Sequence, residues 1–219
     1  MSLWSDLLCE AQRHARGDAL SALHRLEVAV MTGQTNGLDA PLLDCAERIG
    51  QAEQKVASGS EIVRMSELVT LSQFGAGSIG TAIAGIYDAP DAARTLEAMF
   101  VSKFLTELML QRRAYPNLFP SDLLRNHAVE RSGLNDPGAR PVLAAIVDRA
   151  TESYARITGF DAGKAHPELA VLTIYEKKLL SKRLRRLSVD PCIHGAIDLG
   201  VWDRFSTAIS LRLRKRPSP

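Results

Sequence analysis

The chain has 219 residues, of which 46% are hydrophobic, 5% aromatic and 24% charged, and its formal net charge is +2. This composition excludes an intrinsically disordered chain, because the apolar content is enough to bury the core of one domain. Ala, Leu, Arg and Glu are abundant and aromatic residues are few, which favours helices over strands. The sequence therefore predicts an all-α protein.

The cysteines and the hydropathy pattern bear on the compartment. Cys9, Cys45 and Cys192 are odd in number and far apart, so a disulfide framework and a CxxC metal pair are both excluded. No run approaches the ~18 apolar residues of a membrane span, and the first residues lack the order of a secretory signal. We expect a cytoplasmic protein.

The first quarter of the chain carries two helical patterns. Apolar residues recur at helical spacing over residues 7–31, as one helix or as two with a break near Gly17, and Gly33 ends the pattern. Asp39, directly before a proline-containing first turn, is the expected N-cap of a second helix that runs into residues 51–55.

The next segment is unusual for its small residues. A helix is predicted over residues 61–72, and residues 74–86 then contain glycines at 75, 77 and 80, a match to GxGxxG. A dinucleotide site would need a strand before this motif. Otherwise the glycines lie within a helix, where each costs roughly 1 kcal/mol against alanine, so that a neighbouring helix or an apolar ligand must approach closely.

The rest of the chain predicts further helices separated by proline-containing turns. Their expected ranges are 92–113, 121–127, 142–157, 167–187 and 199–213. No internal repeat is visible. We therefore expect one helical domain over residues 1–213, followed by a disordered tail at residues 214–219.

Several short motifs occur in a recognisable order between residues 60 and 187. They are Ser66-Glu67-Leu68, Ala76-Gly77-Ser78-Ile79-Gly80, Ala92 to Met99, Leu105-Thr106, Phe119-Pro120-Ser121-Asp122-Leu123-Leu124 and the segment Leu169 to Arg186. This order resembles the C-terminal half of the squalene/phytoene synthase family, in which an AGxVG helix precedes an LTNxLRD helix and a YLPxDLL turn. The chain resembles a divergent and shortened member.

The resemblance implies a fold and an activity. The fold would be an isoprenoid-synthase-like helical bundle around a central apolar cavity that holds prenyl chains. Active members of this family of trans-isoprenyl diphosphate synthases bind diphosphates through Mg²⁺ held by two acidic motifs, and join two prenyl chains head to head. Carboxylates are needed there because Mg²⁺ prefers hard oxygen ligands.

The acidic motifs of the family are not found in this sequence. After Leu105-Thr106 the expected Arg-Asp pair falls on Leu110 and Gln111, so Glu107 is the single weak candidate for a metal ligand. Asp39 and Asp44 in the first third form no DxxxD pair. We therefore expect no metal site, no cofactor and a loss of prenyl transfer.

If the cavity persists without metals, it is expected to bind an isoprenoid or another lipid. Its expected lining is Gly77, Gly80, Ala84, Leu108 and Met109. Arg112 and Arg113 would then face an anionic head group, because arginine forks suit phosphates. Alternatively, both arginines are solvated residues at the C-terminus of a helix.

A second basic feature is the segment Lys177 to Arg186, where six Lys or Arg side chains recur at three- and four-residue steps. It is either an ordinary solvated face or a peripheral contact with an anionic membrane. No aromatic residues or reading motif accompany the charge, so we expect no nucleic-acid binding.

Three functions therefore remain open. The chain is a squalene/phytoene synthase-like protein that binds an isoprenoid, a lipid or a protein partner without prenyl transfer. It is alternatively an active transferase that uses Mg²⁺, with Glu107 among its ligands. A third possibility is a helical interaction domain whose small-residue helix serves only for packing.

Overall fold

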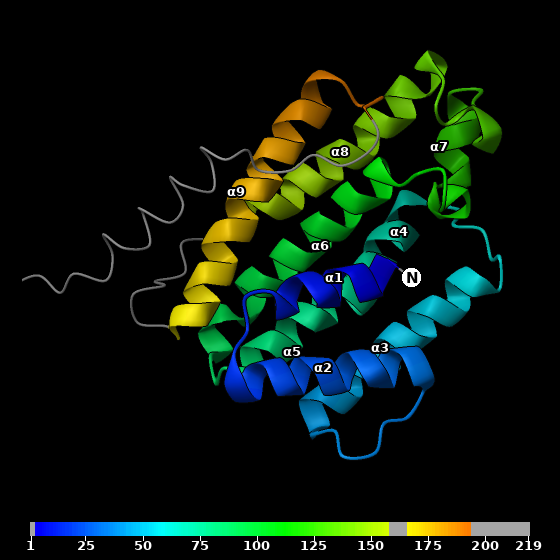
Figure 1. Cartoon of the computed structure of the whole chain (residues 1–219). Coiled ribbons are helices and arrows are strands. Elements are labelled where there is room, and N and C mark those ends of the chain that lie inside the picture. The colour runs from blue at the N-terminus through cyan, green and yellow to red at the C-terminus, as the bar shows by residue number, and fades with distance from the viewer. Residues whose placement is uncertain (1–2, 158–165, 194–219) are drawn as a thin grey trace, which may run out of the picture.

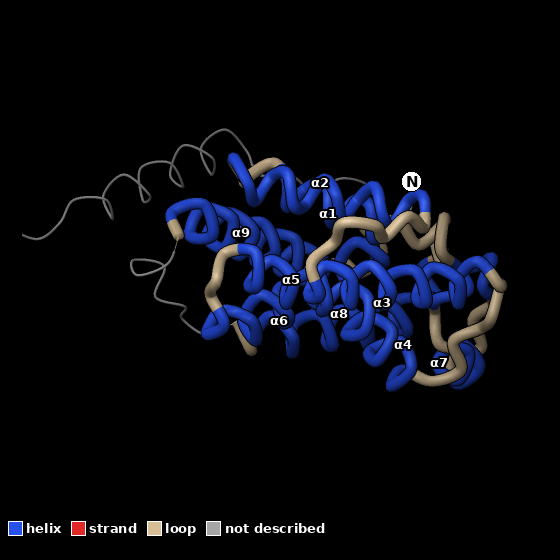
Figure 2. Tube along the Cα trace, turned by 90° about the horizontal axis from the view of Figure 1, so that it is seen from below, coloured by secondary structure: helices blue, strands red, loops and turns tan. Residues whose placement is uncertain are grey.

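The computed structural model describes residues 3–157 and 166–193, and within them every regular element is a helix (Figures 1 and 2). The predicted all-α class is confirmed. The predicted helix at 199–213 and the predicted tail at 214–219 lie outside the described residues.

The helices follow the predicted order with shifted ends. The α-helices are α1 (Leu3–Gln12), α2 (Gly17–Thr32), α3 (Ala40–Ala57), α4 (Met65–Ser72), α5 (Ser78–Ile86), α6 (Ala93–Leu110), α7 (Ser121–Asn126), α8 (Arg140–Ala155) and α9 (Pro167–Val189). The pattern over residues 7–31 forms two helices, α1 and α2, because Gly17 adopts a positive φ of 50°. Gly33 ends α2 in the left-handed conformation, with a φ of 72°, as its position predicted.

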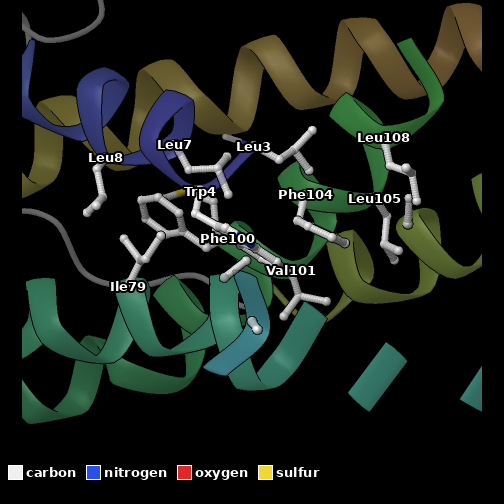
Figure 3. Close-up of a cluster of buried hydrophobic side chains, with 14 of the residues drawn as sticks. Leu3, Trp4, Leu7, Leu8, Ile79, Phe100, Val101, Phe104, Leu105 and Leu108 are labelled. Atoms are coloured by element: carbon white, nitrogen blue, oxygen red, sulfur yellow. The ribbon is translucent and has the colours of Figure 1, made fainter. Parts of the chain in front are cut away.

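Helix α6 runs through the middle of the bundle (Figure 1) and contacts α1, α5, α8 and α9. Thirteen of its eighteen residues are buried, so other parts of the chain cover this helix on almost every side. On the side of α1, the Trp4 and Phe104 rings stack with their centroids 4.5 Å apart (Figure 3). The core is therefore organised around α6.

The small-residue segment lies inside one continuous helical stretch. Helix α4 passes through a π-helical turn, Gln73–Gly77, directly into α5. A dinucleotide fingerprint requires a strand before its first glycine, and α4 occupies that position. The dinucleotide alternative is therefore wrong, and the glycines lie within a helix.

Helix α4 begins at Met65, four residues later than predicted. The preceding residues are held by the first turn of α7: the Ser121 amide donates to the carbonyl of Ile62 at 2.9 Å, and the Asp122 amide donates to that of Val63 at 3.0 Å. Backbone groups used in this way are not available for an earlier helical turn.

The stretch Met65–Ile86 is long and apolar enough to cross a membrane by length and hydropathy alone. Most of its apolar window is buried against the other helices of the bundle. Such burial is typical of a core helix, so this stretch gives only weak evidence for a membrane span.

Candidate functional site

Five charged side chains meet in the interior where α1, α6 and α9 pack together. They are Glu10 from α1, Lys103 and Glu107 from α6, and Glu176 and Arg183 from α9, and we call them the charge cluster. Lys103 and Glu107 stand four residues apart, and Glu176 and Arg183 seven apart, so each pair lies on one face of its helix.

Lys103 is the centre of the first ion-pair group. Its side chain is only 1% exposed, and its Nζ lies 2.7 Å from Glu176 Oε2 and in direct contact with Glu10 Oε2. Glu176 is also buried, with 2% of its side chain exposed. An ammonium group this deep loses its hydration, so it stays in the interior only because the two carboxylates compensate its charge.

The second ion pair joins Glu107 Oε1 to the guanidinium of Arg183. Burial raises the pKa of Glu107 above its ordinary value, although Arg183 acts in the opposite direction. For Glu10 the balance is reversed. Burial opposes its ionisation, but attraction to Lys103, Arg183 and Arg13 outweighs that effect and lowers its pKa. Charges from three helices thus act on one another.

His14 lies beside the charge cluster, in the turn that follows α1. Its ring packs against Tyr175 with centroids 4.8 Å apart. Burial lowers its pKa, with Lys103 and Arg13 acting in the same direction and Glu176 and Glu10 opposing. The neutral imidazole is therefore favoured in the folded protein.

The carboxylates of the charge cluster form ion pairs with cationic side chains of the chain itself. Three carboxylates face one ammonium and one guanidinium, and within residues 3–157 and 166–193 no group of three His, Cys, Asp or Glu side chains is arranged to hold a metal ion. Glu107, the weak metal candidate, is the partner of Arg183.

Sequence reasoning did not identify Glu10, Lys103, Glu176 or the role of Arg183. One signal was present: Lys103 interrupts the apolar run of α6 between Val101 and Leu105. A lysine at a core position of a helix needs a buried partner, but its partners lie on α1 and α9, far away in the sequence.

The predicted cavity residues are buried in the helix packing but lie at different places along α6, because Gly80 faces Leu96, twelve positions before Leu108. Gly77, Gly80, Ala84, Leu108 and Met109 are all buried. At Gly80 an added Cβ would lie 2.5 Å from the carbonyl carbon of Leu96 and 2.6 Å from the amide nitrogen of Glu97. At this point α5 therefore contacts the backbone of α6 directly, and the missing side chain leaves no space for a ligand.

Arg112 and Arg113 do not act as a pair. Arg113 is exposed, whereas Arg112 is 1% exposed and donates to the backbone carbonyls of Met109, Leu134, Cys192 and Ile193. The guanidinium of Arg112 thus binds carbonyl groups, because it lies just after the end of α6, where the loop at Leu134 and the segment after α9 pack against it. This geometry assigns Arg112 a structural role in place of the expected contact with a head group.

The basic segment of α9 is divided between the core and the surface. Arg183 belongs to the charge cluster, and Lys177 donates to the carbonyl of Ile157 at 3.2 Å. Arg185 and Arg186 are exposed. The six basic side chains therefore do not form one continuous outward face.

Three of the cavities on the described part of the molecule are lined by residues other than the five predicted cavity residues. One of about 360 Å³ lies between α3 and α4 and is lined by Gln51, Ala52, Lys55, Ser66, Glu67, Thr70, Leu71 and Phe74. A second, of about 270 Å³, lies between α2, α3 and α5, and a third, of about 440 Å³, between the π turn, α6 and α8. The first combines an apolar wall with a charged rim.

Comparisons with known proteins add no relative. No family model matches the chain, and no curated protein matches it either.

Proposed function

We propose that this protein is a squalene/phytoene synthase-like helical bundle that binds an isoprenoid or other lipid chain, and that it has lost prenyl transfer. The observation that carries the loss of prenyl transfer is Lys103, whose ammonium group lies between the carboxylates of Glu10 and Glu176. A metal-dependent transferase needs interior carboxylates with free oxygen atoms, and this chain pairs its interior carboxylates with its own cations.

The chemistry of the donor set supports this reading. For Mg²⁺ to bind Glu10 and Glu176, the Lys103 ammonium would have to leave a site with 1% exposure and remain charged elsewhere in the core. Removing one partner from a buried ion pair typically costs about 3–5 kcal/mol. A metal would therefore have to displace an internal competitor that is always present.

The cavity between α3 and α4 is the place where we propose that the lipid chain binds. Its volume of about 360 Å³ falls within the usual range for small-molecule sites. Ala52, Leu71 and Phe74 provide apolar surface. Lys55 is an exposed cation of the lining that can attract an anionic head group, and the one carboxylate of the lining, Glu67, accepts a hydrogen bond from the Val63 amide at 3.1 Å. These are different residues from those that the sequence predicted.

Titration calorimetry with farnesyl diphosphate and geranylgeranyl diphosphate, with and without Mg²⁺, tests the proposal. We expect binding that does not depend on the metal and no release of diphosphate. Thr70→Trp should block the cavity and abolish binding, because Thr70 is exposed at its lining. The matched control is Thr32→Trp, at an exposed position at the end of α2.

Other outcomes favour the alternatives. Metal-dependent binding with diphosphate release would identify an active transferase and contradict our proposal. Absence of binding under both conditions would favour a helical interaction domain. The contact of Gly80 with the α6 backbone is the observation that supports this second candidate, because it gives the small-residue helix a packing role that needs no ligand.

A further inference from the structure

The cavity of about 440 Å³ borders the same π turn as the proposed lipid site. Gln73, the first residue of the π turn, lines it, whereas the next residue, Phe74, lines the cavity between α3 and α4. The other walls come from the first half of α6 and the end of α8. A π turn within an α-helix is frequently found at a functional site.

Two arginines on different helices line this cavity. Arg94 comes from α6 and Arg156 follows directly after α8. Both are exposed, and within residues 3–157 and 166–193 neither guanidinium has a hydrogen-bond or ion-pair partner. Arginine presents a rigid fork of donors that matches carboxylate and phosphate oxygens. The cavity therefore has two guanidinium groups in its lining that can donate hydrogen bonds to one oxyanion.

The remaining lining defines the rest of the ligand. Gln73 and Ser153 provide neutral hydrogen-bonding groups, and Val101 provides an apolar wall. Glu97 adds one carboxylate. A bare anion would be repelled by that carboxylate, whereas an anion that also carries a hydroxyl or amine can donate to it.

The absence of a side chain at Gly77 leaves room for Glu97 and Val101 in the lining of the cavity. An added Cβ there would lie 3.1 Å from Glu97 Cγ and 3.6 Å from Val101 Cγ2, so a side chain would press on two residues of the lining. The predicted cavity residue Gly77 thus lies behind this cavity, although it does not line it.

We propose that this cavity binds a small organic oxyanion that carries a hydroxyl or amine next to a short carbon body. Arg94 and Arg156 bind the anionic group from two helices, and Glu97 accepts from the donor group. The anionic group is a phosphate or a carboxylate, since both match the arginine fork. This site is separate from the proposed lipid cavity and does not depend on it.

Isothermal titration of the full chain with glycerol 3-phosphate, 3-hydroxybutyrate and inorganic phosphate tests the proposal. We expect one of the two organic anions to bind, which also decides between phosphate and carboxylate, and inorganic phosphate to bind at least about tenfold more weakly, because it has no carbon body. Arg94→Gln and Arg156→Gln should each weaken binding by about tenfold or more. Arg113→Gln, which removes an exposed arginine outside the cavity, is the matched control and should leave the affinity unchanged.

The exposed positions of both arginines mean that these variants keep their fold, which far-ultraviolet circular dichroism verifies. No binding of either organic anion overturns the proposal. An equal loss in Arg113→Gln also overturns it, because the attraction would then be a general charge effect. Thr70→Trp should leave this binding intact, which separates failure of this site from failure of the lipid cavity.

Discussion

Replacing Lys103 by methionine tests whether the charge cluster holds α1 and α9 on α6. Methionine keeps most of the length of the side chain and removes its charge, so the change mainly removes the ion pairs. Glu176 would then lie in the interior with 2% exposure, whereas Glu10, with 22% of its side chain exposed, can recover part of its hydration. Most of the cost should therefore come from Glu176.

The magnitude follows from burial. Breaking a buried ion pair by removing one partner costs about 3–5 kcal/mol, because the remaining charge is left desolvated. We expect Lys103→Met to lower the free energy of unfolding by that amount at pH 7. The deficit should shrink as the pH falls, since the unpaired carboxylates of the variant can then take up protons.

Urea unfolding followed by circular dichroism measures the effect, with Lys55→Met as the control because Lys55 is exposed. The double variant Lys103→Met/Glu176→Gln should recover at least about 1 kcal/mol relative to the single variant, because the orphaned charge is removed with its partner. A loss below about 1 kcal/mol in Lys103→Met at pH 7, or a double variant no more stable than the single one, would refute the reasoning.

Three further results are expected. Gly80→Ala should destabilise the protein by about 1–3 kcal/mol in urea unfolding, because the added Cβ meets the α6 backbone. Gly50→Ala is the control: its added Cβ has no neighbouring atom within 4 Å, so it should stabilise the protein by up to about 1 kcal/mol, and equal effects of the two changes would contradict the close contact at Gly80. His14 has a lowered pKa in the folded state, so its contribution to stability is complete above pH 6.5 and is lost as the pH falls below that value. His14→Gln should therefore lose less free energy of unfolding than the unchanged protein between pH 7 and 5, and parallel pH profiles of the two proteins would count against this. Arg112→Met should cost at least about 2 kcal/mol in thermal or urea unfolding, because four backbone carbonyls lose their donor, and a neutral result would exclude the structural role.

Local patterns in the sequence predicted the helices well where the signal was local. The break near Gly17 and the end at Gly33 depend on backbone preferences of single residues, and both occur as expected. The start at Met65 was missed because it depends on hydrogen bonds from Ser121 and Asp122, a segment far along the chain. Tertiary contacts of this kind leave no periodic signal.

The candidate site was predictable only in part. The sequence left the small-residue helix open as a packing device or as the wall of a ligand site, and Gly80 meets the backbone of its neighbour. Arg112 was expected to face an anion, but its partners are carbonyls brought by two distant loops. Lys103 stood out in an apolar run, yet one sequence does not reveal which distant carboxylates reach it.

The position of Lys103 in the middle of the chain has a consequence for synthesis on the ribosome. Its partners come from the first helix and the last described one, and the backbone amide of Arg16 likewise donates to Glu168, 152 positions later. A nascent chain that has released α6 but not α9 can offer this lysine only one of its two partners. The ion pairs of Lys103 are therefore complete only after α9 has left the ribosome.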